Sequence, residues 1–217
     1  MLARIRLSAL LSLACIPAWS HHGPRDVDDS TAGVFDYYLL SLSWSPDYCL
    51  THARDQAQCD QRGLGFVLHG LWPQFDAGDF PQYCRGAQSL SAQATVFGQT
   101  IYPSLTLMRH EWQSHGTCSG LDALSYFKIA DRALASVQVP QQLEAPKRNL
   151  ELSAAQITAM FRTANPRLPE NAITVVCSRG ELSEVRVCLT RALVPRACGQ
   201  RVRSRCPLGA VQIPSSR

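Results

Sequence analysis

The chain has 217 residues, of which 46% are hydrophobic and 18% are charged. These proportions exclude a disordered or fibrous chain, and the length predicts a single globular domain. The formal net charge of +4 suits a polyanionic partner, because basic side chains neutralise phosphates. Many unrelated exported proteins carry a similar charge, so composition alone identifies no function.

Residues 1–20 have the features of a secretory signal sequence. A short cationic start precedes an apolar run at residues 7–16, and Ala18 and Ser20 provide small residues at the positions that a signal peptidase reads. The run is too short for a permanent transmembrane anchor. A buried N-terminal helix and a lipoprotein site at Cys15 are the alternative interpretations.

We therefore expect residues 1–20 to be cleaved and the protein to be secreted or periplasmic. Residues 21–34 are expected to form a flexible segment, and residues 35–217 a single domain. This mature chain is expected to be a monomer without a membrane anchor.

Eight cysteines remain besides Cys15, and none of them forms a CxxC pair. An even number of cysteines in an exported chain predicts disulfides rather than zinc ligands. The spacing alone leaves about 105 possible pairings open.

Apolar runs predict strands at residues 35–43, 65–71, 172–177 and 182–189. We expect the first strand to end at the turn signal Ser45-Pro46-Asp47 and the second to stop at Pro73. The last two strands are expected to form a hairpin at Arg179-Gly180.

Helical spacing of apolar residues predicts helices at residues 105–115, 123–137 and 153–164, with Ser153 as an N-cap. Strands and helices interleave irregularly along the chain. This order favours an α+β domain with a central antiparallel sheet, flanked by helices and stabilised by disulfides.

Two segments contain most of the chemically reactive residues, FVLHGLWP at 66–73 and HEWQSHGTC at 110–118. In the second, Glu111 and His115 are four residues apart, so a helix places them on one face, where the carboxylate can orient the imidazole. His110 lies five residues before His115. A zinc protease needs two histidines four apart, so this spacing disfavours one.

His69 precedes Gly70 at the expected end of a strand, where we expect space beside the backbone for a ligand. A lone histidine there is usually structural. Here, however, both segments also carry a tryptophan that can stack on a base. His21, His22 and His52 lie in polar contexts, and we assign them no role.

Two imidazoles with pKa values near neutrality can cleave RNA without a metal or another cofactor. One deprotonates the 2′-hydroxyl of the substrate, and the other protonates the departing 5′-oxygen. A further donor must stabilise the phosphorane, and His110 is available for this. The two segments contain no Ser or Cys nucleophile motif of the G-x-S-x-G type.

HGLWP and HEWxxHGTC, about forty residues apart and in this order, resemble the active-site signatures of the ribonuclease T2 family. The likeness runs from Phe35 to Cys206, and SWSPDYC at residues 43–49 is similar to the opening strand of bacterial members. The resemblance implies an endoribonuclease that converts single-stranded RNA to 2′,3′-cyclic phosphates and then to 3′-phosphates.

The resemblance also implies roles for individual residues. His69 corresponds to the general acid and His115 to the general base, while Glu111 assists His115 and His110 binds the phosphate. No metal is implied.

Trp72 and Phe80 match aromatics that hold the first base, although an aromatic after a strand is usually part of the core. Trp112 is interpreted as a core residue. The disulfides of the family imply the pairs Cys84–Cys118, Cys177–Cys206 and Cys188–Cys198, which leaves Cys49 with Cys59.

The sequence departs from the family at three positions. Ser114 stands where a lysine usually precedes the second catalytic histidine, so we expect Ser114 to bind phosphate more weakly and to limit the rate. Gln74 replaces an acidic residue, and Ser43 replaces a base-reading glutamine of plant members. Base preference is therefore open.

Two other classes of function stay open. One is an RNA-binding module with an impaired site, which the intact His69, Glu111 and His115 argue against. The other is a zinc hydrolase, which the histidine spacing argues against. Digestion of RNA in the presence of a chelator distinguishes all three.

Overall fold

The computed structural model describes residues 31–60, 63–84 and 89–216. The predicted signal sequence and most of the expected flexible segment lie outside these residues. Where that segment is described, the Gly33 N–H donates to the Cys118 carbonyl, which holds residues 31–34 against the domain. No described helix is long and apolar enough to cross a membrane.

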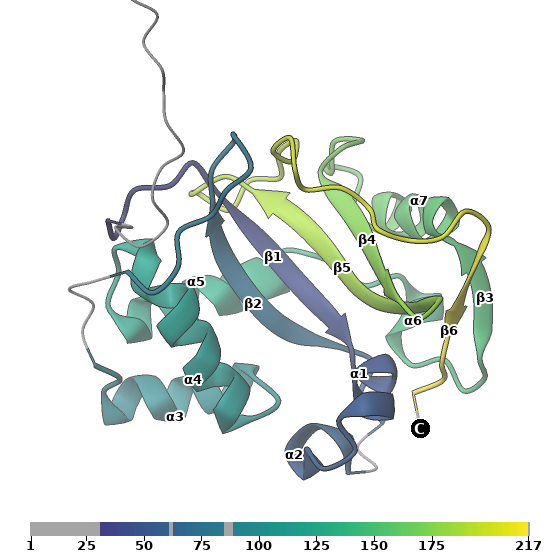
Figure 1. The fold of residues 1–217 in the computed structure, drawn as a ribbon, viewed down its shortest axis with the longest axis horizontal. Coiled ribbons are helices and arrows are strands. Elements are labelled where there is room, and N and C mark those ends of the chain that lie inside the picture. The colour runs from purple at the N-terminus through teal and green to yellow at the C-terminus, as the bar shows by residue number, and fades with distance from the viewer. Residues whose placement is uncertain (1–30, 61–62, 85–88, 217) are drawn as a thin grey trace, which may run out of the picture.

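The described residues form a six-stranded sheet in the order β2-β1-β5-β6-β3, with β4 also paired to β5 (Figure 1). The strands are β1 (Tyr37–Trp44), β2 (Phe66–Gln74), β3 (Leu150–Ser153), β4 (Ile173–Ser178), β5 (Glu181–Leu189) and β6 (Ala210–Ile213). Pairing is antiparallel except between β5 and β6.

In Figure 1, α3, α4 and α5 are gathered beside β2 at the left, and α6 and α7 lie at the right, near β3 and β4. The helices are α1 (Ser45–Thr51), α2 (Gln56–Cys59), α3 (Ala92–Ile101), α4 (Leu105–Ser114), α5 (Ala123–Ala135), α6 (Gln141–Glu144), α7 (Ala154–Ala164) and the 3-10 helix η2 (Gly116–Ser119). The predicted α+β class is confirmed.

The two faces of the sheet have different surroundings. On one face Leu40, Leu68 and Leu71 are almost fully buried in the main core, together with Trp112, which is the core residue the sequence predicts. On the other face Tyr37, Leu39 and Cys188 form a smaller cluster, against which Trp72 and Val202 pack. The candidate site lies on this second face.

Two expected element boundaries are wrong. Ser45-Pro46-Asp47 begins α1 instead of forming a turn, because proline fits the first helical turn, where its missing N–H costs nothing, and Asp47 favours the helix N-terminus. β2 continues through Pro73 to Gln74. It lies at the edge of the sheet, where a proline is tolerated.

Other predicted elements are confirmed. The Ser153 side chain caps α7 in a capping box with Gln156. Arg179 and Gly180 both have positive φ in the tight turn between β4 and β5, which is the geometry of a two-residue hairpin. α5 ends at Ala135, two residues earlier than expected.

Candidate active site

His69 lies at a β-bulge in β2. The register of β1 against β2 shifts between Leu68 and Gly70, so His69 has no direct partner on β1. A bulge redirects side chains relative to the regular alternation. Here it lets Leu68 and Leu71 both reach the core, while the His69 side chain stays 29% exposed.

A carboxylate from β5 holds the His69 ring, and the sequence did not indicate it. Glu184 Oε1 lies 2.8 Å from His69 Nδ1. The other oxygen, Oε2, accepts hydrogen bonds from Arg186 at 2.6 Å and from Ser41 Oγ at 3.1 Å. With Oε2 fixed in this way, Glu184 presents Oε1 to the imidazole.

This pair keeps both partners charged. Burial alone would lower the pKa of His69, but the hydrogen bond to Glu184 and the charges of Glu184 and Glu111 raise that pKa above its ordinary 6.5. Burial would raise the pKa of Glu184, but His69 and Arg186 lower it to about 2. His69 therefore retains its proton to a higher pH than a free histidine.

Glu111 reaches the same histidine from α4 and is almost fully buried. Its Oε2 accepts a hydrogen bond from Trp72 Nε1 at 2.6 Å. Its Oε1 lies 3.6 Å from His69 Nε2 and accepts no hydrogen bond within the described residues. Burial raises the pKa of Glu111 to about 7, although the His69 charge and the Trp72 hydrogen bond oppose this rise.

The space expected beside Gly70 for a ligand is filled by the protein itself. A Cβ at Gly70 would collide with Glu111 Oε2 and Trp72 Nε1. This position therefore needs a glycine so that the Glu111–Trp72 hydrogen bond can pass close to the backbone.

Gly70→Ala should displace this hydrogen bond. Overpacking of this kind destabilises a protein by about 1–3 kcal/mol, and the displaced Glu111 should also lower activity. Urea denaturation and kcat/KM on RNA measure the two effects. Wild-type stability together with wild-type activity would contradict this account of Gly70.

His115 follows the last residue of α4 and has non-helical backbone angles, φ −126° and ψ −45°. The expected alignment of Glu111 and His115 on one helical face is therefore absent. The backbone N–H of His115 donates to the Glu111 carbonyl at 3.0 Å, whereas no hydrogen bond joins these two described side chains. Glu111 contacts His69 and Trp72 instead.

The His115 ring is 8% exposed, and its Nδ1 is buried without a hydrogen-bond partner in the described structure. Burial, together with the charges of His110 and His69, lowers the pKa of His115 to about 3. Its imidazole is therefore neutral over the whole physiological range.

Trp72 packs against both histidines. Its ring centroid is 5.0 Å from that of His69 and 5.2 Å from that of His115. The Arg186 guanidinium carbon lies 5.1 Å from the indole centroid, and Phe80, 41% exposed, has its centroid 6.2 Å from that of His115. Side chains that the sequence predicted, and Arg186, which it did not, thus lie around Trp72.

His110 and Ser114 lie next to each other on α4. His110 is exposed on α4, and its Nδ1 is 3.5 Å from Ser114 Oγ. Ser114 is 1% exposed, so its hydroxyl faces protein rather than solvent.

Two pockets flank the histidines. The larger, the Trp72 pocket, has a volume of about 470 Å³ and is lined in part by Trp72, Phe80, His115 and Arg186. The smaller, the Ser43 pocket, has a volume of about 200 Å³ and is lined in part by Ser43, Tyr48, His52 and His69. His52, to which the sequence assigned no role, stacks on Tyr48 with a centroid separation of 4.1 Å.

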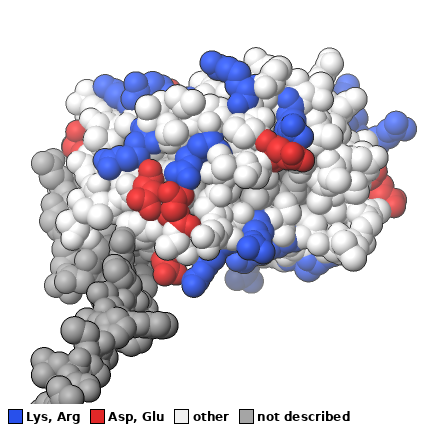
Figure 2. Space-filling model, turned by 90° about the horizontal axis from the view of Figure 1, so that it is seen from above, with Lys and Arg blue, Asp and Glu red and all other residues white. Residues whose placement is uncertain are grey.

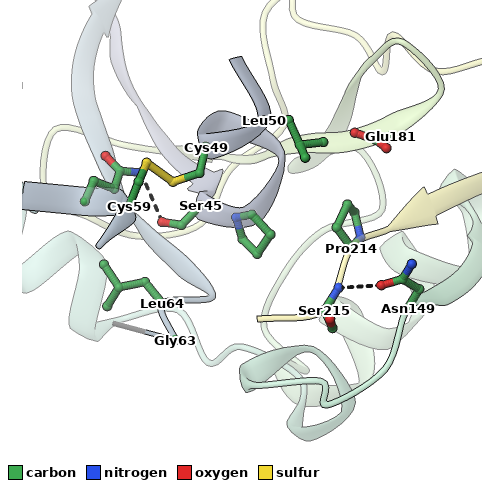
Figure 3. Close-up of a pocket in the computed structure, with 12 residues that line it drawn as sticks. Ser45, Cys49, Leu50, Cys59, Gly63, Leu64, Asn149, Glu181, Pro214 and Ser215 are labelled. Carbon is green, nitrogen blue, oxygen red and sulfur yellow. Dashed lines mark hydrogen bonds between the residues drawn. A yellow bond between two sulfur atoms is a disulfide. The ribbon is translucent and has the colours of Figure 1, made fainter. Parts of the chain in front are cut away.

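A third hollow of about 450 Å³ lies between α1, α2 and the C-terminal segment (Figure 3). Its walls include the Cys49–Cys59 disulfide, Asn149 and Pro214. It contains none of the predicted catalytic or substrate-binding residues.

The three disulfides that the resemblance implies are present, and so is the remaining pair, Cys49–Cys59. Cys84–Cys118 ties the chain after β2 to η2, three residues beyond His115, and so links the two motifs. Within residues 31–60, 63–84 and 89–216, no group of three or more His, Cys, Asp or Glu side chains is arranged to hold a metal ion.

Comparison with known proteins supports the family that the sequence motifs resemble. The model of the ribonuclease T2 family matches residues 35–198. A ribonuclease of Aeromonas hydrophila is 44% identical over 117 residues, covering 54% of this chain and 53% of its own. A probable ribonuclease of Haemophilus influenzae is 32% identical over 166 residues, covering 68% of this chain and 56% of its own.

The matches to these two bacterial relatives thus span little more than half of their lengths. Among solved structures, an RNase-related protein from Calystegia sepium superposes with a TM-score of 0.69 at 23% identity. That superposition covers 84% of this chain and 98% of the plant protein, and it shows a shared fold.

Proposed function

Because the chain belongs to the ribonuclease T2 family, we propose that it is an exported endoribonuclease that cleaves single-stranded RNA through the 2′-hydroxyl of its substrate. One observation carries the proposal. The rings of His69 and His115 both lie close to the Trp72 ring, and their pKa values are shifted in opposite directions. An acid–base pair needs one charged and one neutral imidazole at the same pH.

In the first step, neutral His115 takes the proton of the 2′-hydroxyl, and the resulting oxygen nucleophile attacks the adjacent phosphorus. Protonated His69 gives its proton to the 5′-oxygen as that P–O bond breaks. The products are a 2′,3′-cyclic phosphate and a free 5′-hydroxyl. In the second step, His69 takes a proton from water, the hydroxide opens the ring, and His115 returns its proton to the 2′-oxygen. No metal or cofactor takes part.

Glu111 and Arg186 are placed to stabilise the phosphorane. Below a pH of about 7, Glu111 carries a proton, and its unpaired Oε1 can donate a hydrogen bond to a phosphate oxygen beside His69. Arg186, held by Glu184 and close to the Trp72 ring, would supply the cation that Ser114 does not. His110, whose ring is exposed, remains the proposed second phosphate ligand, and Ser114 would act through it.

The two pockets suggest how the substrate lies. The Trp72 pocket, with exposed Phe80 at its wall, would take the base of the nucleotide whose 2′-hydroxyl reacts. The Ser43 pocket would take the base that follows. The scissile phosphate then lies between His115 and His69.

Export is part of the proposal. Four disulfides persist in oxidising compartments, which supports secretion or a periplasmic location for the chain after residue 20.

Residues 21–217 should degrade single-stranded RNA and leave DNA of the same sequence intact, because DNA lacks the nucleophile. The rate should be unchanged by EDTA. Gel analysis of both substrates, with and without EDTA, measures this. Cleavage of DNA at a similar rate, or loss of activity in EDTA with recovery on adding zinc, would contradict the proposed function.

A further inference from the structure

The chain after β5 carries arginines beside the Trp72 pocket. Arg201, Arg203 and Arg205 line this pocket together with His115, and all three are exposed. In Figure 1 this chain crosses the upper edge of the sheet, and Figure 2, seen from above, shows basic side chains in several patches on that side. One wall of the proposed active site is therefore basic.

These arginines differ in whether they form an ion pair with an acidic residue. Arg201 pairs with Asp79 at 2.9 Å, which ties it to the loop after β2. In the part of the chain that the structure describes, neither Arg203 nor Arg205 forms an ion pair, and Arg203 Nε donates only to the Gln200 carbonyl. Two positive charges beside the pocket thus have no carboxylate to neutralise them.

Hydrogen bonds join the segment that carries these arginines to β4. The residue between them, Ser204, faces β4, where its Oγ accepts the Val175 N–H at 3.0 Å. The Arg205 N–H donates to the Val175 carbonyl, and the Arg205 carbonyl accepts from the Cys177 N–H. Arg203 and Arg205 stand on either side of Ser204 in the chain, and both line the Trp72 pocket.

Two disulfides hold this segment at its ends. Cys188–Cys198 fixes its start to β5, and Cys177–Cys206 fixes its end to β4. The arginines are therefore presented on a constrained backbone, and binding of a ligand costs less ordering entropy.

We propose that Arg203 and Arg205 form a phosphate-binding subsite for RNA on the 5′ side of the nucleotide that is cleaved. The inference rests on the proposed function. If the Trp72 pocket holds the base of that nucleotide and the Ser43 pocket the base that follows, the 3′ side of the strand runs toward the Ser43 pocket. Arg203 and Arg205 line the Trp72 pocket and not the Ser43 pocket, which favours the phosphate on the 5′ side. Arginine pairs with phosphate in a bidentate geometry, and such pairing positions a strand without reading its sequence.

The test uses oligonucleotides with a single ribonucleotide among deoxynucleotides, so that only one bond can be cleaved. A minimal substrate has one nucleotide on the 3′ side and none on the 5′ side. A second carries several more nucleotides on its 5′ side, and a third carries them on its 3′ side. Wild type is compared with Arg203→Ala/Arg205→Ala and with a control, Arg132→Ala/Arg162→Ala, at exposed positions of α5 and α7.

The 5′-extended substrate should have a higher kcat/KM than the minimal one in wild type and in the control. The loss of kcat/KM in the Arg203→Ala/Arg205→Ala variant should be at least about tenfold larger on the 5′-extended substrate than on the other two. The slope of log(kcat/KM) against log salt should also become shallower, by about 0.7 for each phosphate that the variant no longer neutralises.

Equal losses on all three substrates, a loss confined to the 3′-extended substrate, or no loss at all would overturn the subsite while leaving the proposed function intact. If wild type cleaved none of the three, the proposed function itself would be overturned, and the subsite with it. Thermal denaturation verifies that both double variants are folded.

Discussion

His69→Ala and His115→Ala are each expected to lower kcat/KM on single-stranded RNA by about 10²–10⁴-fold, the usual contribution of a positioned acid or base. Each variant removes one of the two proton transfers of the proposed mechanism. The remaining activity should come from binding and from stabilisation of the phosphorane.

Gln113→Ala provides the control, because Gln113 is exposed on the same helix as Glu111 and lines neither the Trp72 pocket nor the Ser43 pocket. It should retain wild-type activity. The acid–base assignment would fail if either histidine variant kept more than about a tenth of the wild-type rate.

Glu184→Gln is expected to lower kcat/KM by about 10–100-fold, as loss of an orienting partner does for other imidazoles. It should also move the alkaline limb of the pH profile of kcat/KM to lower pH. The pKa of His69 is raised because Glu184 favours its charged form. Without that charge, burial and the nearby Arg186 lower the pKa, so His69 loses its proton, and the enzyme its acid, at lower pH.

The pH shift separates this positioning role from simple loss of stability. Glu151→Gln, at an exposed site on β3, is the control and should leave the profile unchanged. Glu184→Asp should restore part of the raised pKa of His69, so its alkaline limb should lie between those of Glu184→Gln and the wild type. A Glu184→Gln enzyme with reduced activity and an unmoved alkaline limb would contradict the proposed coupling to His69.

The sequence predicted the fold class and most of the longer elements because their apolar periodicity is strong. It did not predict α3, which has 10 residues. α7 and the β4–β5 hairpin follow local signals, a capping serine and a turn pair with positive φ. α1 was missed because Ser-Pro-Asp is typical of both a turn and the first turn of a helix. β3 and β6 have four residues each, too few for a periodic pattern.

The site was predicted only where local motifs encode it. His69 and Glu184 are 115 residues apart, and they meet because β1 pairs with both β2 and β5. The alternation of Glu184 and Arg186 with buried valines indicates a polar face on β5, but nothing local indicates that this face turns toward a histidine. The bulge at His69 and the non-helical backbone of His115 likewise depend on the tertiary structure.

The central claim is that the substrate's own 2′-hydroxyl attacks the phosphorus between His115 and His69. Its most direct test is mass spectrometry of the early products from an oligonucleotide with one ribonucleotide, digested in EDTA. The account predicts a single cut after the ribonucleotide, a 2′,3′-cyclic phosphate on the 5′ fragment and a free 5′-hydroxyl on the other. A 5′-phosphate on the second fragment, or cuts at deoxynucleotides, would contradict it.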